Sequence, residues 1–180
     1  MKRLRLALFF SGILVAPVVP AEVVDAAAGG FSIRHSVEIA APRADVWFAA
    51  TDHIGEWWSD DHTVSGDANR MSIDAKPQGC FCETLGPRSG VVHMTVTFVN
   101  PAVMLRLSGG LGPLGLMGTA GNMTWEFDDS ETGTTLTLRY AVGGYLPQGL
   151  DQVATAVDGV LAEQLDSLKR FVEMQHASPD

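Results

Sequence analysis

The residues of this sequence that could transfer protons are a glutamate and a histidine on separate expected strands. Glu83 follows Phe81 with one residue between them, so the two side chains share one face of a strand. A carboxyl group in an apolar cavity has a raised pKa and can act as an acid or a base near neutral pH. His35 falls on the apolar face of its strand, where it can orient the polar end of a ligand or hydrogen-bond the backbone. Strand alternation also allows a second arrangement, in which Cys80 and Cys82 point inward and Glu83 lies in water.

Two other segments resemble ligand-binding motifs without meeting their requirements. Residues 51–62 gather aspartate, histidine and glutamate side chains, but they lack the H-E-x-x-H pattern, in which two histidines lie four positions apart on a helix. Residues 110–115 match G-x-G-x-x-G, yet Pro113 removes one amide of the phosphate cradle and a strand follows. We therefore expect no metal ion and no cofactor. The surrounding glycine-rich segment, residues 109–121 with six glycines, predicts either a mobile apolar loop over a cavity mouth or a wide hairpin connection.

The two cysteines, Cys80 and Cys82, are separated by one residue. On a regular strand their Cα atoms would lie roughly 6.5 Å apart, near the outer limit for a disulfide. We therefore expect two half-buried thiols, with a strained, redox-active pair as the alternative. A zinc site is disfavoured because no second cysteine pair supplies the remaining ligands.

The first 21 residues have the pattern of a secretory signal peptide. Basic residues precede an apolar run over residues 6–19, and Ala21 provides a small residue at a suitable cleavage point. The alternatives are an uncleaved N-terminal anchor and cleavage after Ala26. The pattern predicts export to the periplasm or to the medium, with no stable membrane span after cleavage.

Charge limits the partners of the exported chain. The predicted leader contains three basic and no acidic residues, so its removal changes the formal net charge from −9 to −12. A surface this acidic repels phosphate backbones, which disfavours nucleic-acid binding.

The spacing of apolar residues predicts an α+β domain. Alternation over residues 31–39 indicates a half-buried strand, and two short helices are expected at 42–50 and 54–58. Further strands and turns lead to one long amphipathic helix over residues 150–172. We expect a curved antiparallel sheet wrapped around this helix, with a cavity between them. The expected organisation is a leader at 1–21, a flexible segment at 22–30, one domain at 31–175 and a disordered tail at 176–180.

Two local predictions depend on regular geometry. Trp57 and Trp58 are adjacent on one helical turn and cannot both face the core, so at least one is expected at the cavity rim or the surface. Residues 91–99 alternate as a strand. In that strand one face is expected to carry Val92, Met94, Val96 and Phe98, and the other face His93, Thr95 and Thr97.

Several short motifs resemble one known superfamily. They are Ile39-Ala40-Ala41-Pro42 followed by Val46-Trp47, then Trp57-Trp58, residues 79–83, residues 121–125 and residues 133–138. Together with the order of elements, they are similar to the helix-grip fold of the START/Bet v 1-like, or SRPBCC, superfamily. The similarity is to its polyketide-cyclase-like or activator-of-heat-shock-protein-ATPase-like branch and covers about residues 31–173. The resemblance implies an apolar cavity for lipids, sterols or polyketides, with occasional cyclase or dehydratase chemistry.

These observations give three functional hypotheses. The first is an exported carrier of a small hydrophobic molecule, lipid or polyketide-like. The second is a cyclase or dehydratase with Glu83 as acid/base and His35 as its orienting partner. The third is a protein-interaction module that docks through exposed tryptophans near Trp57-Trp58. For the first hypothesis the expected ligand contacts are Trp57, Trp58, Phe81, Glu83, Met117, Trp125 and Tyr140.

Overall fold

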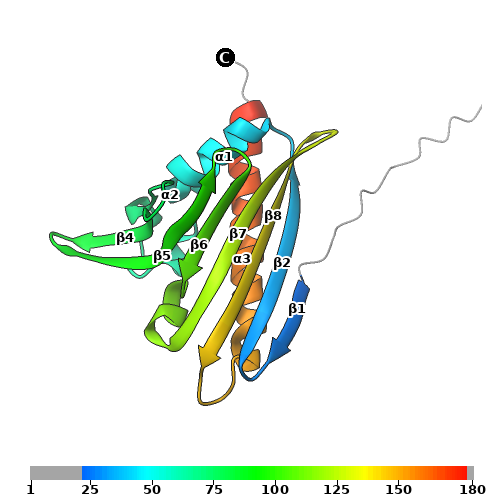
Figure 1. Ribbon diagram of the computed structural model, residues 1–180. Helices are drawn as coiled ribbons and strands as arrows, with labels where there is room; N and C mark the ends of the chain where they lie inside the picture. The colour runs from blue at the N-terminus through cyan, green and yellow to red at the C-terminus, as the bar shows by residue number, and fades with distance from the viewer. Residues whose placement is uncertain (1–21, 178–180) are drawn as a thin grey trace, which may run out of the picture.

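The computed structural model describes residues 22–177, and the predicted signal peptide lies outside this range. Within the described residues, eight antiparallel strands form one open sheet in the order β1-β2-β8-β7-β6-β5-β4-β3, and the long helix α3 crosses one face (Figure 1). This arrangement confirms the predicted helix-grip fold. The strands are β1 (Glu22–Ala27), β2 (Gly30–Ile39), β3 (Met71–Ile73), β4 (Cys80–Gly86), β5 (Ser89–Asn100), β6 (Met104–Gly109), β7 (Gly118–Ser130) and β8 (Gly133–Tyr145). The helices are α1 (Arg43–Asp52), α2 (Ile54–Trp57) and α3 (Asp151–Ala177), with 3-10 turns η1 (Asp60–His62), η2 (Ala68–Arg70) and η3 (Gly112–Leu116).

The ends of the domain differ from the expected boundaries. Residues 22–27, expected to be part of a flexible segment, form β1 and pair with β2 through a tight turn before Gly30. The pairing gives the backbone of β1 hydrogen-bond partners, which composition alone does not reveal. Helix α3 continues to Ala177, beyond the expected domain end.

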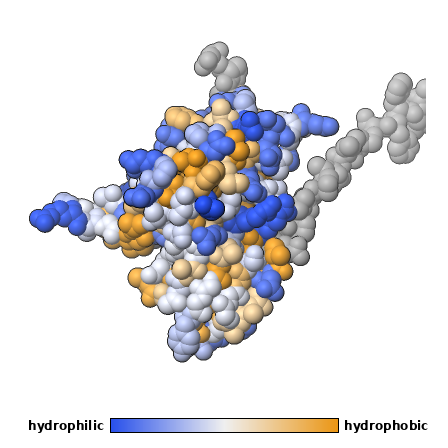
Figure 2. All heavy atoms as spheres, viewed as in Figure 1, coloured by the Kyte–Doolittle hydropathy of each residue, from blue (hydrophilic) through white to orange (hydrophobic). Residues whose placement is uncertain are grey.

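Helix α3 supplies the apolar stripe that the three- and four-residue spacing predicts. Leu161, Leu165 and Leu168 are buried against the sheet, together with Ala154 and Val172. The outer face of the sheet has a different character, since hydrophilic and hydrophobic side chains are interspersed over the side seen in Figure 2. The core therefore lies between the sheet and α3.

Strand β5 contains two irregularities that reverse part of the predicted alternation. Phe81 pairs with Met94 and Cys82 with Val92, so His93 is an extra residue opposite β4. An extra residue of this kind turns the following side chains to the other face. His93 and Met94 are both buried, whereas Val92 is 64% exposed, so the expected assignment of His93 and Val92 to faces was wrong.

A second irregularity lies four residues further along β5. Val96 pairs with Leu107 and Phe98 with Arg106, which leaves Thr97 as the extra residue. Phe98 is consequently 41% exposed on the outer face, where the Arg106 guanidinium lies 5.6 Å from its ring centre. The expectation that Phe98 shares the inner face with Met94 was therefore also wrong.

Cys80 and Cys82 form a disulfide, so the expectation of two free thiols was wrong. Their Cα atoms are 5.3 Å apart, closer than regular strand geometry gives. The shortening coincides with the register shift between β4 and β5 at Phe81 and Cys82. The observed separation lies within the ordinary range for a disulfide.

Both tryptophans of the Trp57-Trp58 pair are buried, so the expectation that they cannot both face the core was wrong. Helix α2 ends at Trp57, and Trp58 has extended backbone angles of φ −68° and ψ 142°. Because the two residues do not share a helical turn, both side chains can turn inward. The Trp57 indole N–H donates to the Ala49 carbonyl at 2.9 Å. The proposed docking patch of exposed tryptophans is therefore excluded at this position.

Candidate functional site

A cavity of about 510 Å³ lies between α3, the η3 segment, the segment after α2 and the edge of the sheet near β5. Most of its wall is apolar, and four polar side chains contribute: Asp61, His62, Thr63 and His93. The apolar part of the lining consists of Trp58, Val64, Met71, Val91, Leu111, Pro113, Leu114, Leu116, Met117, Val153, Ala156, Val157, Val160 and Leu161.

The residues expected to contact a ligand divide into two groups. Trp58 and Met117 line the cavity. The other five are buried in the structure but are not part of the lining: Trp57, Phe81, Glu83, Trp125 and Tyr140. Their role as ligand contacts stays a prediction.

Three parts of the wall were not named as ligand contacts from the sequence. Val157 and Leu161 belong to the apolar stripe of α3, whose spacing was visible but not assigned to the cavity. Leu114 belongs to the glycine-rich segment that was expected to form either a lid or a hairpin connection. That segment joins β6 to β7 and also forms a cavity wall, so the hairpin connection is confirmed, while a mobile lid stays a prediction. The position of His93 in the wall could not be predicted, because no residue type or spacing in the sequence indicates the bulge that turns His93 inward.

His93 and Glu83 form a buried pair at the sheet side of the cavity. Glu83 is 1% exposed and points inward with Phe81. Of the two arrangements expected for β4, this is the one in which Glu83 is buried. His93, which is 4% exposed, lines the cavity, and its Nε2 lies 3.1 Å from Glu83 Oε2. The bulge in β5 places the imidazole between Glu83 and the cavity wall.

Both carboxylate oxygens of Glu83 accept hydrogen bonds. Its Oε2 accepts the Val64 N–H at 2.9 Å, and its Oε1 accepts the Ser65 N–H at 2.5 Å. Burial by itself would raise the pKa of Glu83, but hydrogen bonds from Ser65, Val64 and His93 outweigh burial and lower the pKa below its ordinary value. Glu83 is therefore an ionised acceptor that fixes the segment after η1 and holds the His93 ring, rather than a neutral acid.

His35 lies apart from this pair, on the face of β2 that meets α3. Its Nε2 lies 2.9 Å from Asp158 Oδ1, although the two groups are not aligned for a hydrogen bond. His35 and Asp158 are not cavity-lining residues. The structure therefore does not bring His35 together with Glu83, as the enzyme hypothesis requires.

The side chains of the acidic and histidine-rich segment 51–62 form hydrogen bonds and ion pairs within the protein. Thr51 donates to Asp52 at 2.7 Å, and Asp60 Oδ1 accepts the Ala68 N–H at 2.7 Å. His62 Nε2 lies 3.3 Å from Glu163 Oε2 on α3. Among residues 22–177, no three His, Cys, Asp or Glu side chains converge as metal ligands would.

Tyr140 anchors the glycine-rich wall of the cavity from β8. Its hydroxyl donates to the Gly109 carbonyl at 3.2 Å and accepts the Leu111 N–H at 3.1 Å. The ring fits closely over Gly121, where an added Cβ would lie 2.6 Å from Tyr140 Cε2. Burial raises the pKa of Tyr140, so the phenol stays neutral and keeps both hydrogen bonds.

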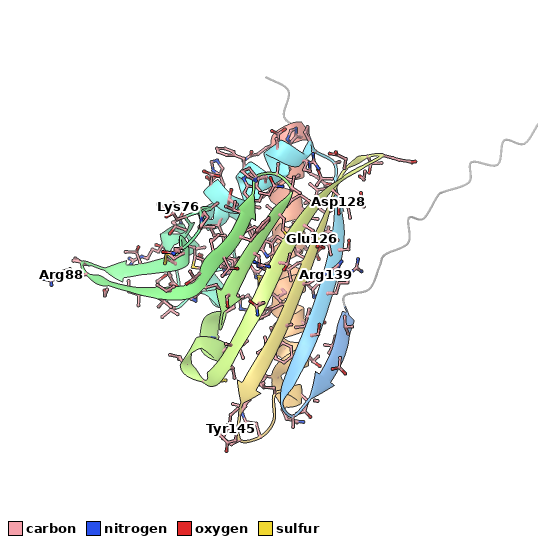
Figure 3. All side chains as sticks on the ribbon, viewed as in Figure 1. Lys76, Arg88, Glu126, Asp128, Arg139 and Tyr145 are labelled. Carbon is pink, nitrogen blue, oxygen red and sulfur yellow. A yellow bond between two sulfur atoms is a disulfide. The ribbon has the colours of Figure 1, made fainter. Side chains whose placement is uncertain are left out.

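Removing this hydroxyl tests the anchor. Tyr140→Phe is expected to lower the free energy of unfolding by about 1 kcal/mol, because two partly buried backbone groups lose their partner. Amide hydrogen exchange should accelerate in residues 109–117. The matched control is Tyr145→Phe at the exposed end of β8 (Figure 3), which should change neither quantity. Unchanged exchange in 109–117 for Tyr140→Phe would contradict the anchoring role.

Comparisons with known proteins agree with this architecture. The family model described as "Polyketide cyclase / dehydrase and lipid transport" matches residues 30–173. No curated protein is significantly similar to the chain. Within residues 22–177, no helix combines the length and the apolar character needed to cross a bilayer.

Solved structures share the fold at low sequence identity. A protein from Rhizobium leguminosarum is 19% identical with a TM-score of 0.60, covering 81% of this chain and 95% of its own. A protein from Mesorhizobium loti is 17% identical with a TM-score of 0.55, covering 82% and 99%. A Staphylococcus aureus protein of unknown function is 14% identical with a TM-score of 0.56, covering 83% and 97%. Because the family model spans most of the sequence, the chain belongs to the polyketide cyclase/dehydrase and lipid transport family of the SRPBCC superfamily.

Proposed function

We propose that this protein is an exported carrier that holds one small hydrophobic molecule, lipid or polyketide-like, between the sheet and α3. The observation that carries this proposal is the cavity of about 510 Å³ with its predominantly apolar wall. Pockets for small molecules commonly enclose about 300 to 1,000 Å³ and combine apolar walls with a few placed polar groups. Membership of a family associated with lipid transport supports the same reading.

Export is the second part of the proposal and depends on the pattern of residues 1–21. A basic start, an apolar run and a small residue at the expected cleavage point support it. A disulfide between Cys80 and Cys82 is also typical of proteins outside the reducing cytosol.

Native mass spectrometry of the protein from the exported fraction of its host tests both parts. We expect an intact mass that begins after Ala21, with extra mass that disappears on denaturation. The emptied protein should bind the neutral fluorescent probe N-phenyl-1-naphthylamine. A bare mass together with no probe binding would contradict the carrier function, whereas absence of the protein from the exported fraction would contradict export alone.

One observation favours a second candidate function, a cyclase or dehydratase. A carboxylate that holds one nitrogen of a histidine ring in the wall of a cavity is a common arrangement for proton transfer. In this version His93 would contact the substrate and Glu83 would position His93, since both Glu83 oxygens are already occupied. Recovery of a hydroxylated ligand lighter by one water after incubation would support it, and unchanged ligand mass would argue against it.

A further inference from the structure

Histidine–carboxylate pairs join α3 to the elements around it. All five histidines of the chain lie within 3.4 Å of a carboxylate oxygen, and three of these pairs have one partner on α3. The three are His35 of β2 with Asp158 at 2.9 Å, His62 of η1 with Glu163 at 3.3 Å, and Asp45 of α1 with His176 at 3.4 Å, each measured from the imidazole Nε2 to a carboxylate oxygen. The position of α3 therefore depends on charges from three separate elements.

The strength of these pairs depends on the charge of the histidine. Among residues 22–177, neither Asp158 nor Glu163 forms an ion pair with a lysine or an arginine. Histidine is the side chain whose charge ordinarily changes between about pH 5 and 8. A protonated imidazole attracts a carboxylate, whereas a neutral ring keeps at most a hydrogen bond. The attraction between α3 and its neighbours therefore weakens as pH rises through this range.

The pair between His35 and Asp158 is enclosed by the fold. The side chains are 5% and 14% exposed. On β8 the cross-strand partner of His35 is Leu138, the neighbours along the same face of β2 are apolar, and Asp25 of the adjacent β1 is exposed. The α3 residues one turn before and after Asp158 are uncharged. Because charges attract more strongly where water is excluded, this pair responds to the protonation of one ring.

The pair between His62 and Glu163 connects two walls of the cavity. His62 is a lining residue of the η1 segment, and Glu163 follows the lining residues of α3. The acidic neighbours of His62 have other surroundings, since Asp60 Oδ1 accepts the Ala68 N–H at 2.7 Å and Asp61 is exposed. An exposed pair of this kind is weak by itself. Its position across the cavity nevertheless makes it a direct link between the two walls.

A different contact anchors the C-terminal half of α3. Lys169 Nζ lies 2.6 Å from Glu173 Oε1 and also donates to the Glu38 carbonyl, and Glu173 accepts the Ala40 N–H at 3.0 Å. Burial would raise the pKa of Glu173, but hydrogen bonds from Lys169 and Ala40 lower it below its ordinary value, so the carboxylate stays ionised where histidine titrates. The lining residues of α3, at 153–161, precede this anchor. Loss of histidine charge therefore loosens mainly the part of α3 that forms the cavity wall.

We propose that the His35–Asp158 and His62–Glu163 pairs make ligand retention depend on pH. They hold the cavity wall of α3 in place when the histidines are protonated, and they loosen it as pH rises and the rings become neutral. This inference rests on the proposed carrier function and adds a means of release to the same site. A carrier with these pairs retains its ligand in an acidic environment and releases it faster where pH is higher.

Dissociation of N-phenyl-1-naphthylamine, which is neutral throughout this range, tests the proposal by stopped-flow fluorescence. In the unmodified protein we expect dissociation about three- to tenfold faster at about pH 8.5 than at about pH 5.5. The double variant Asp158→Asn/Glu163→Gln keeps the side-chain shapes and removes both charges. The ratio of its two rates should fall below about two, because the remaining His53–Glu56 and His93–Glu83 pairs do not involve α3.

Lys169→Gln is the matched control. It weakens the attachment of α3 but removes no group that titrates in this range, so dissociation should accelerate by the same factor at both pH values. Glu163→Gln alone should lower the ratio part of the way. Because the Glu163 side chain is 52% exposed, this single variant decides the question even if the double variant does not fold.

Amide hydrogen exchange of the ligand-free protein provides a second readout that needs no probe. After correction for intrinsic rates, residues 153–163 should be more protected at the lower pH in the unmodified protein and equally protected at both pH values in the double variant. A dissociation ratio near one in the unmodified protein, or a ratio that survives in the double variant, would overturn the inference. If the probe does not bind at all, the carrier function fails, and the exchange measurement alone decides whether the pairs loosen α3.

Discussion

Glu83→Gln is expected to lower the free energy of unfolding by about 1.5 to 3 kcal/mol, the usual contribution of a hydrogen bond to a charged group. The carboxylate accepts two backbone N–H groups and contacts His93, whereas a glutamine amide offers one acceptor and an NH₂ group that repels these donors. Urea unfolding followed by tryptophan fluorescence measures the change.

The matched control is Glu126→Gln, which alters the Glu126–Arg139 pair on the outer face of the sheet. An exposed pair of this kind contributes at most about 1 kcal/mol, so this variant should remain close to the unmodified protein. Equal effects of the two substitutions would show that Glu83 does not hold the cavity wall.

The same variant predicts a pH dependence. The pKa of Glu83 is lowered in the folded state, so Glu83 stabilises the protein above its ordinary value of 4.5, and this contribution is lost as pH falls through the folded-state pKa. The difference in stability between the unmodified protein and Glu83→Gln should therefore be full at pH 7 and shrink below about pH 4.5. A difference that stays constant down to acid unfolding would contradict this assignment.

Val157→Trp is expected to weaken binding of N-phenyl-1-naphthylamine by more than about tenfold, because the added ring occupies the cavity from the α3 wall. Val157 is half-buried and faces the cavity on α3. Overpacking is expected to cost about 1 to 3 kcal/mol of stability, so circular dichroism must first show that the variant is folded.

Thr155→Trp provides the control for Val157→Trp on the same helix. Thr155 is exposed and is not part of the cavity lining, so its replacement should leave probe affinity unchanged. Undiminished binding in a folded Val157→Trp variant would place the ligand elsewhere and contradict the proposed carrier function.

Periodicity was sufficient to predict the architecture. The two-residue repeat of apolar side chains in β2 and their three- and four-residue spacing in α3 indicate which side chains are buried. Both elements lie in the structure where this periodicity predicts them. The same logic failed in β5, where His93 and Thr97 are extra residues opposite single partners. A bulge depends on pairing with a neighbouring strand, and a strand read alone does not contain that information.

The candidate site could be predicted only in part for a related reason. Trp58 and Met117 were named, and the glycine-rich segment was placed at the cavity mouth by one of its two interpretations. The acid/base hypothesis identified Glu83, but hydrogen bonds from Val64 and Ser65 give this carboxylate a different role. Those contacts join segments that lie 18 or 19 positions apart, which residue types and spacing do not specify.

The order of the strands has a consequence for how the chain reaches its native state. β2 pairs with β8, so that Ser36 and Thr137, 101 positions apart in the sequence, share a hydrogen bond. Contacts between such distant segments slow folding because a long loop must close before they form. The β1–β2 hairpin joins the rest of the sheet only through β8, so the sheet cannot be completed during synthesis until nearly the whole chain is available. A chain with this topology stays incompletely folded until late, a state that is compatible with threading through a membrane channel.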